Sequence, residues 1–192
     1  MVASPYLILP GLGNSGPEHW QSLWQAELGC ERLELPDWDA PRLSRWLYLA
    51  IEAIEQRPGV VLIAHSLGCI LVAHVAAARP DLDIGGALLV APADVDSRRH
   101  TPDRLGDFAP LPRVALPFPA VLVASRSDPH MDFAVAAGLA ADWGARLVDA
   151  GAVGHINVVS GHGVWPEGRG LLADVTGGGP HRRAGAEDHP AP

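Results

Sequence analysis

One segment constrains the fold of this chain more than any other: an apolar run that stops at a tight turn and continues as a small-residue helix. Residues 60–64 read Val-Val-Leu-Ile-Ala, and residues 65–68 read His-Ser-Leu-Gly. The pattern predicts a buried strand, a sharp turn at Ser66 and a helix over 67–78. Such a turn points the serine hydroxyl out of the edge of the sheet, where it is available for reaction.

The turn requires small residues on both sides of the serine, because the strand and the helix pass close together there. Gly68 supplies one of them, and Ala64 stands where the pattern G-x-S-x-G has its other glycine. Alanine is the mildest departure from that pattern. The alternative is that Ser66 only caps the helix, but the strand–turn–helix context favours a nucleophile.

Length and charge limit the partners of the chain. With 192 residues, of which 48% are hydrophobic, it is long enough for one domain with a sizeable core. The formal net charge of −8 disfavours binding to nucleic acid or to an anionic membrane surface. We therefore expect a small-molecule partner, and the sequence does not indicate an oligomeric state.

The chain contains arginine but no lysine. This excludes Schiff-base chemistry, a P-loop lysine and a Ser–Lys catalytic pair. If Ser66 is a nucleophile, its base has to be a histidine or a carboxylate.

Neither metal binding nor a cofactor is predicted. Cys30 and Cys69 lack metal-ligand spacing, and we expect both to be small buried residues in a reducing compartment. The apolar run over 6–9 ends at Pro10-Gly11 and is too short for a signal peptide or a membrane span. The expected location is the cytoplasm.

Short apolar runs alternate with helix-length segments along the chain. This alternation, with strands that are apolar almost throughout, predicts an α/β fold in which helices cover both faces of a mostly parallel central sheet, an αβα sandwich. We expect strands over 6–9, 32–35, 60–65, 86–91, 120–125 and 146–148, and helices over 17–28 (with Pro17 in its first turn), 41–56, 67–78, 131–143 and 166–174.

Two segments break this rhythm. Residues 94–119 are polar and then proline-rich, with no clear helix, and we favour a surface crossing over a cover for the site. Residues 177–192 are rich in glycine, proline and charge, which predicts a disordered tail behind a domain over 1–176.

Three of the predicted strands end at residues suited to acyl transfer. Ser66, Asp128 and His155 follow the strands over 60–65, 120–125 and 146–148, and reactive residues of such sheets collect at the carboxyl ends of the strands. The order Ser…Asp…His is that of the α/β-hydrolase triad. His155 would remove the serine proton, and Asp128 would fix the imidazole tautomer and stabilise the imidazolium.

Other residues compete for these roles. Asp94, Asp96 and Asp149 are alternative acids, and the turn at Asp128-Pro129 could be an ordinary one. His65 precedes the nucleophile, so we expect its side chain to pack against the sheet face.

An oxyanion hole requires two backbone N–H donors. The residue after the nucleophile, Leu67, supplies one, and the loop after the first strand supplies the other, from Leu12 or, as a second choice, from Gly13. The same loop matches the dinucleotide fingerprint Gly-x-Gly-x-x-Gly over residues 11–16. That alternative is weaker, because the acidic residue expected about twenty positions later is poorly matched.

The chain also resembles a known family, the small single-domain α/β-hydrolase family of serine hydrolases related to retinoblastoma-binding protein nine. The resemblance covers roughly residues 5–172. It rests on Leu9-Pro10-Gly11, Glu18-His19-Trp20, Trp24, Ala64-His65-Ser66-Leu67-Gly68, Leu116-Pro117-Phe118-Pro119, Ser125-Arg126-Ser127-Asp128-Pro129, Trp143-Gly144-Ala145, Gly154-His155-Ile156-Asn157 and residues 160–168, Ser-Gly-His-Gly-Val-Trp-Pro-Glu-Gly.

The resemblance implies a reduced α/β-hydrolase fold without a large cap, the triad Ser66, Asp128 and His155, and activity on small esters or amides without a cofactor. The retinoblastoma-pocket motif L-x-C-x-E is not met over residues 28–32, so no partner role follows. We expect a serine hydrolase of carboxylesterase type. The alternatives are an acyltransferase or peptidase with the same triad, or a catalytically weak protein that acts as a binding module.

Overall fold

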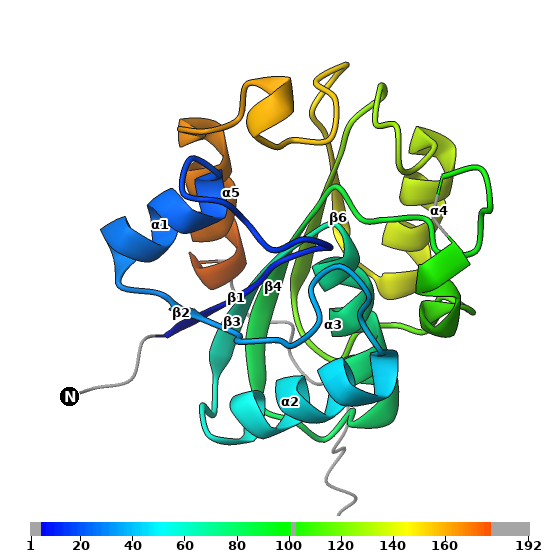
Figure 1. Cartoon of the computed structure of the whole chain (residues 1–192). Helices are drawn as coiled ribbons and strands as arrows, with labels where there is room; N and C mark the ends of the chain where they lie inside the picture. The colour runs from blue at the N-terminus through cyan, green and yellow to red at the C-terminus, as the bar shows by residue number, and fades with distance from the viewer. Residues whose placement is uncertain (1–4, 101–102, 178–192) are drawn as a thin grey trace, which may run out of the picture.

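Six parallel strands form the centre of the structure, a computed structural model that describes residues 5–100 and 103–177. Their order across the sheet is β2-β1-β3-β4-β5-β6, and every neighbouring pair is parallel. The carboxyl ends of the strands therefore share one edge, at the top of Figure 1. The strands are β1 (Tyr6–Leu9), β2 (Glu31–Arg32), β3 (Val60–His65), β4 (Ile84–Val90), β5 (Ala120–Ala124) and β6 (Arg146–Asp149).

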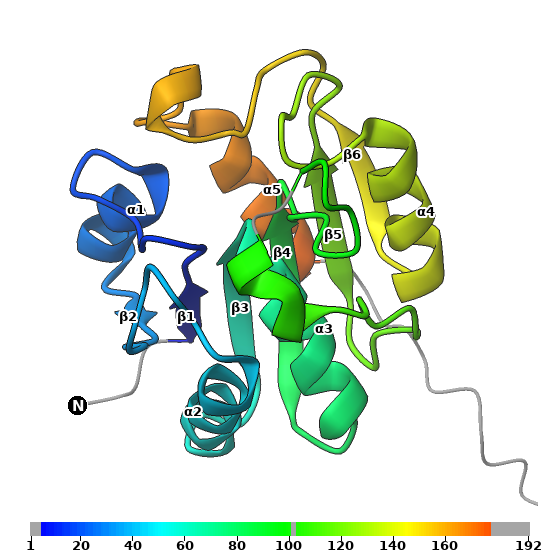
Figure 2. The ribbon, with the colours of Figure 1, turned by 45° about the vertical axis from the view of Figure 1, so that its right-hand side comes forward.

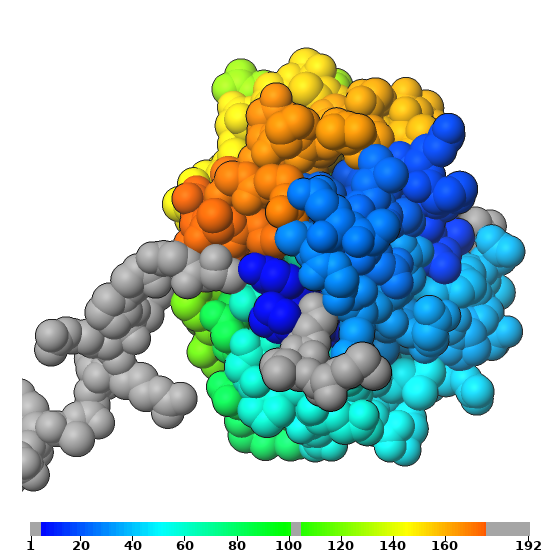
Figure 3. Space-filling model, turned by 90° about the vertical axis from the view of Figure 1, so that its left-hand side faces the viewer, coloured from blue at the N-terminus to red at the C-terminus, as the bar shows by residue number. Residues whose placement is uncertain are grey.

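Helices cover both faces of this sheet (Figures 1 and 2). One core contains residues of α2 (Leu43–Glu55), α3 (Leu67–Ala78) and α4 (Phe133–Trp143), and the other contains residues of α1 (Trp20–Leu28) and α5 (Pro166–Gly177). In Figure 3, α1 and α5 lie side by side in blue and orange, in agreement with the ion pair between Arg169 and Glu27. The three-layer αβα sandwich with a parallel sheet is confirmed.

Strand β3 shows why the central strands are apolar throughout. Val60, Leu62 and Ala64 pack into the core under α2 and α3, whereas Val61 and Ile63 pack into the core under α1 and α5. Successive side chains of a strand point to opposite faces. Because both faces are covered, every position of β3 is buried. The buried strand fixes the position of the turn that follows it at Ser66.

The start of α1 differs from the prediction. The helix begins at Trp20 and not at Pro17, because the ring of His19 caps it: Nδ1 accepts the backbone N–H of Gln21 at 3.2 Å. Pro17 lies in a turn before the helix. The second strand is also shorter than predicted and ends at Arg32.

The expectation of a surface crossing over 94–119 is wrong. The segment contains a 3₁₀ helix, η1 (Asp103–Phe108), and the side chains of Leu105, Phe108 and Leu111 are buried in the core. Leu105 and His100 also line the cavity at the carboxyl edge of the sheet. The segment therefore forms part of a wall of the candidate site.

The tail predicted over 177–192 lies outside the described residues except for Gly177, the last residue of α5. The tail and the domain boundary at 176 remain predictions. Within the described part of the chain, no helix is both long and apolar enough to cross a bilayer.

Candidate active site

The turn after β3 holds Ser66 in a backbone conformation that L-residues rarely adopt. Its φ and ψ are 54° and −121°, and its backbone N–H donates to the carbonyl of Val90 at 3.0 Å. Residues in sparsely populated regions cost on the order of 1–3 kcal/mol and persist only where the surrounding structure enforces them. Here the surrounding structure packs closely around the turn, which is possible because Gly68 and Gly11 have no side chain.

Gly68 and Gly11 leave the space that the turn needs. A Cβ atom on Gly68 would lie 2.2 Å from the carbonyl oxygen of Leu9, and one on Gly11 would lie 2.8 Å from the Cβ of Ser66. Helix α3 therefore packs directly on the end of β1, and the loop after β1 packs directly on the serine. Ala64, at the position where the pattern has glycine, is fully buried in the core.

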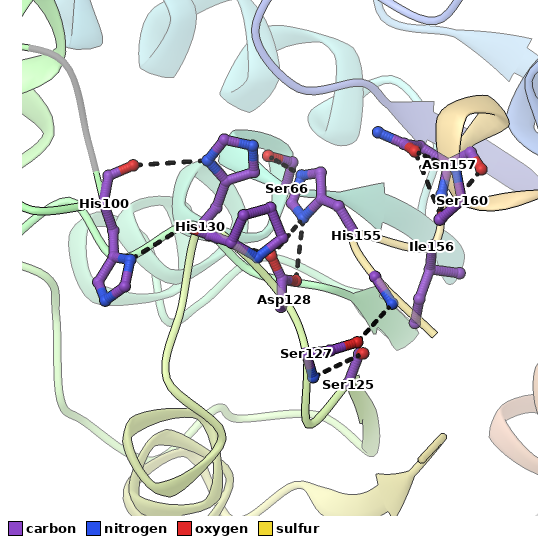
Figure 4. A network of polar contacts seen from close by, with 12 residues as sticks. Ser66, His100, Ser125, Ser127, Asp128, His130, His155, Ile156, Asn157 and Ser160 are labelled. Carbon is purple, nitrogen blue, oxygen red and sulfur yellow. Dashed lines mark hydrogen bonds and ion pairs between the residues drawn. The ribbon is translucent and has the colours of Figure 1, made fainter. Parts of the chain in front are cut away.

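His155 connects the serine to a carboxylate (Figure 4). Its Nε2 lies 3.0 Å from Ser66 Oγ, and its Nδ1 lies 2.9 Å from both Oδ1 and Oδ2 of Asp128. The side chains of Asp128 and His155 are 3% and 9% exposed. The structure thus brings together the three residues that the sequence places at separate strand ends, in the geometry that activates a serine.

The three rival acids are engaged elsewhere. Asp149 pairs with Arg126, whose Nε donates to Oδ2 at 2.8 Å, and this bond lowers the pKa of Asp149. Asp96 accepts the backbone N–H of Leu111, and Asp94 accepts that of Asp96. Asp128 itself accepts the backbone N–H of His130 at 2.8 Å, which fixes the carboxylate beneath the imidazole.

Two serines tie the acid loop to the histidine loop. Ser125 Oγ accepts the backbone N–H of Ser127 at 3.3 Å (Figure 4). It also accepts the backbone N–H of Val153 at 3.0 Å, and Ser127 Oγ accepts the N–H of Gly154 at 3.0 Å. Hydrogen bonds therefore join the loops after β5 and β6 directly to each other. The sequence motif Ser-Arg-Ser-Asp places these hydroxyls beside the acid, but it does not show what they bind.

Two further residues, His65 and Trp20, bind the backbone of the loop that contains His155. Sequence reasoning did not identify either of them as an anchor of this loop. His65 lies in contact with His155, with ring centroids 4.8 Å apart, and its Nε2–H donates to the His155 carbonyl at 2.9 Å. The Nε1–H of Trp20 donates to the carbonyl of Ile156 at 2.9 Å. Burial and then the charge of His155 keep the pKa of His65 well below its usual range, so His65 is a neutral donor.

Leu67 and Leu12, the two expected oxyanion donors, line the same cavity as the serine. Leu67 is the first residue of α3, where the amide has no partner within the helix and the helix dipole favours negative charge. Among the described residues, no hydrogen bond from the amides of Leu12 and Leu67 is found. The amide of Gly13, the second choice, already donates to the carbonyl of Trp38 at 3.0 Å, so Leu12 remains the preferred donor.

The glycine-rich loop does not have the geometry of a dinucleotide site. In that motif the loop opens directly into a helix whose N-terminus receives the phosphates. Here α1 begins at Trp20, four residues after Gly16, and the Gly13 amide is already bonded. The loop instead packs against Ser66.

A cavity of about 350 Å³ opens above the serine. Histidines dominate its polar lining, and no charged carboxylate or arginine is among the lining residues of the described chain. The cavity is lined by Gly11, Leu12, Asn14, His19, His65, Ser66, Leu67, Ala93, His100, Leu105, His130, His155 and Asn157.

Neither cysteine is among the described residues that line the cavity. Cys30 and Cys69 are free and buried, as expected, and burial raises the pKa of the Cys30 thiol to about 11. Over residues 5–100 and 103–177, no group of three or more His, Cys, Asp or Glu side chains is arranged to hold a metal ion.

Comparison with known proteins agrees with this geometry. Residues 6–174 match the model of a family described as serine hydrolase. Among solved structures, the chain is similar to a protein described as a YdeN-like hydrolase from Pectobacterium atrosepticum, with 33% identity, a TM-score of 0.78 and 90% of each chain covered. No curated protein matches the chain.

Two more distant structures show the same fold. The ydeN gene product of B. subtilis is 20% identical, with a TM-score of 0.70 over 90% of this chain and 98% of that one. BorB, a type II thioesterase from the borrelidin biosynthetic cluster, is 16% identical, with a TM-score of 0.62 over 89% and 90% of the two chains. At these identities the likeness concerns the fold alone.

Proposed function

This chain belongs to the serine hydrolase family and has the α/β-hydrolase fold, and from that premise we propose that it cleaves small esters through an acyl-enzyme formed on Ser66. The observation that carries the proposal is the continuous set of hydrogen bonds from Ser66 Oγ through His155 to Asp128. A complete and buried triad favours catalysis over the binding-module alternative.

In the first half of the reaction, Ser66 Oγ attacks the ester carbonyl carbon while His155 Nε2 takes the hydroxyl proton. The carbonyl oxygen becomes an oxyanion, and the imidazolium is stabilised by Asp128 at Nδ1. When the tetrahedral intermediate collapses, the bond to the alcohol oxygen breaks, and His155 returns its proton to that oxygen. The alcohol leaves, and the acyl group remains on Ser66.

In the second half, water takes the place of the alcohol. His155 removes a proton from the water as its oxygen attacks the acyl carbon, and then protonates Ser66 Oγ as the acid is released. The amides of Leu67 and Leu12 would stabilise the oxyanion in both halves. Removing one such donor typically lowers kcat by about 10²–10³-fold.

A serine-directed fluorophosphonate tests this proposal. We expect one label per molecule on Ser66, and loss of both labelling and ester turnover, by about 10⁴-fold or more, in Ser66→Ala. Ser44→Ala, a change at an exposed serine of α2, is the matched control and should behave like the parent. Turnover by a folded Ser66→Ala protein at the parent rate would overturn the assignment.

The cavity also limits the substrate. A volume of about 350 Å³ is at the small end for ligand sites, which are typically about 300–1,000 Å³. Methylene groups of a long acyl chain that lie outside the cavity each forgo about 0.8 kcal/mol of binding free energy. We expect kcat/KM for p-nitrophenyl esters to be highest for short acyl chains, and a maximum at palmitate would contradict this.

A further inference from the structure

His19 is one of the residues that line the cavity, and it caps helix α1 with only one of its two ring nitrogens, Nδ1. As the N-cap of α1, it accepts the backbone N–H of Gln21 on Nδ1 at 3.2 Å. The residue is 6% exposed, and it is among the residues that line the cavity above Ser66. Its ring packs edge-on against that of His65, with centroids 4.9 Å apart.

The cap determines where the ring proton is. An amide N–H requires a lone pair on its acceptor, so Nδ1 is unprotonated and the neutral ring carries its proton on Nε2. Burial, assisted by the charges of Arg32 and His155, lowers the pKa of His19 to about 4. At neutral pH the ring is therefore an uncharged donor with a fixed tautomer.

This donor is unused within the described chain. No hydrogen bond is found for Nε2 of His19, and Nε2 is not among the fully buried side-chain atoms without a partner, which belong to Arg32, Arg57 and Arg169. Nε2 therefore keeps some exposed surface, and His19 is one of the residues that line the cavity. The corresponding N–H of His65, in contrast, is bonded to the His155 carbonyl.

We propose that the Nε2–H of His19 binds a second, uncharged oxygen of the substrate, one that lies outside the scissile ester group. The inference rests on the proposed esterase function and narrows its substrate class to esters with a hydroxyl, ether or carbonyl oxygen in the acyl or the alcohol part. A purely hydrocarbon ester of the same shape would cover this donor without satisfying it, and a site built around a donor discriminates against such a ligand. An uncharged oxygen is favoured because, among the described residues, no arginine lines the cavity to pair with a carboxylate.

Two substitutions separate the two nitrogens of His19. Asparagine is among the best N-cap residues, so His19→Asn keeps the cap but is too short to reach the cavity. Glutamine places an amide N–H near the position of Nε2 but caps poorly, so His19→Gln keeps the cavity donor and weakens the start of α1. A purely structural role would make Gln the more harmful change, and a substrate role would make Asn the more harmful one.

The substrates are two matched pairs in which one methylene is replaced by an ether oxygen. For the acyl arm these are p-nitrophenyl pentanoate and p-nitrophenyl 3-methoxypropanoate, and for the alcohol arm butyl acetate and 2-methoxyethyl acetate. The readout is the ratio of kcat/KM for the oxygenated ester to that for the alkyl ester. This ratio cancels any change that affects both esters alike.

We expect His19→Asn to lower this ratio by about 3- to 10-fold in one arm, which is the size of one neutral hydrogen bond, and His19→Gln to keep it within about twofold of the parent. The affected arm identifies the part of the substrate that carries the oxygen. If His19→Asn leaves both ratios unchanged while the parent hydrolyses these esters, the proposal for His19 is wrong. If the parent hydrolyses none of them, the esterase function itself fails.

Discussion

The two reacting side chains of the proposed triad are held in place by different means. Ser66 is fixed by its own backbone and by close packing, in a turn where Gly68 and Gly11 leave no room for a single added carbon. His155 lies in a loop that is held by hydrogen bonds from distant side chains, including those of His65 and Trp20. The nucleophile is therefore placed by shape, and the base is placed by polar contacts.

The difference predicts how each region fails. Gly68 packs directly against the backbone carbonyl of Leu9, and a backbone carbonyl cannot shift by itself to make room. A larger residue at position 68 should therefore displace the whole end of β1. The histidine loop has several independent anchors, so removing one should produce a graded loss. The exception is the one contact of His155 that carries charge, which is the contact with Asp128.

The largest expected effect is at that contact. Asp128→Asn keeps the shape of the side chain but imposes the wrong tautomer on His155, so we expect kcat to fall by about 10⁴-fold with the fold intact. Asp96→Asn and Asp149→Asn are the controls and should be far milder. A crippling effect of either control, with an active Asp128→Asn enzyme, would show that the acid is misassigned.

The next largest effect is expected from a substitution in the closely packed turn around Ser66. In Gly68→Ala the new Cβ would overlap the Leu9 carbonyl, so the end of β1 and the Leu12 amide must move. We expect about 10²-fold lower kcat and a loss of about 1–3 kcal/mol in the free energy of unfolding. Activity and urea midpoint both measured at parent values would contradict this account.

Gly138→Ala is the matched control for that experiment. Gly138 lies inside α4, and no other atom lies within 4 Å of the position its Cβ would take. Alanine should therefore stabilise the helix, by about 0.5–1 kcal/mol, without changing turnover. If Gly68→Ala lowers the free energy of unfolding and Gly138→Ala raises it, the close packing at Gly68 is the cause of the loss there.

A smaller effect is expected at an anchor of the base. His65→Leu removes the donor to the His155 carbonyl and leaves that buried acceptor unpaired, which costs about 1–3 kcal/mol of stability. We expect kcat to fall by about 10-fold with little change in KM, because the imidazole is less well oriented. His65→Gln retains an N–H donor at a similar reach and should recover part of kcat, whereas equal losses in both variants would argue against the anchor.

The last prediction uses pH to weaken the same region, and it concerns stability without any change of turnover. His65 and His19 have lowered pKa values in the folded protein, with that of His19 at about 4, whereas both titrate near 6.5 in the unfolded chain. Between these values the unfolded chain binds more protons, so stability is present above pH 6.5 and is lost as the pH falls. For His19 we expect a loss of roughly 2 kcal/mol between pH 7 and pH 5, and the lowered pKa of His65 acts in the same direction.

Urea unfolding at the two pH values measures this loss. His19→Asn removes one titrating group and should reduce the difference between pH 7 and pH 5 by about the contribution of one group. A difference that is identical in the parent and in this variant would show that His19 is already protonated in the folded state. Between pH 7 and pH 8 the histidine contribution should be flat.

The sequence predicted the region held by shape better than the region held by polar contacts. The bounds of β3 and α3 agree with the predicted 60–65 and 67–78, because a continuous apolar run and a glycine at the turn are local signals. The first helix was predicted three residues early, because a histidine that caps through its ring leaves no familiar pattern. The segment over 94–119 was misjudged, since its buried residues Leu105, Phe108 and Leu111 recur every three residues, the repeat of a short 3₁₀ turn and not of an α-helix or a strand.

The same contrast holds within the candidate site. Strand-end reasoning placed Ser66, Asp128 and His155 at one edge, and the structure brings them into hydrogen-bond distance, although their catalytic roles remain proposals. It could not identify Trp20 as an anchor, because its partner Ile156 is 136 residues away along the chain. It also could not show that the amide of Gly13 is bonded to Trp38 through a contact between two loops.

The anchor between Trp20 and Ile156 has a consequence for the biosynthesis of the protein. A ribosome releases the nucleophile turn and its glycine-rich partner loop early, whereas His155 emerges 89 residues after Ser66. Until then the growing chain contains Ser66 without His155, and Trp20 of α1 lacks its hydrogen-bond partner, the carbonyl of Ile156. Under the proposed mechanism, ester hydrolysis therefore begins only after His155 has left the ribosome, and a chain that stops before this residue would have the serine but not its base.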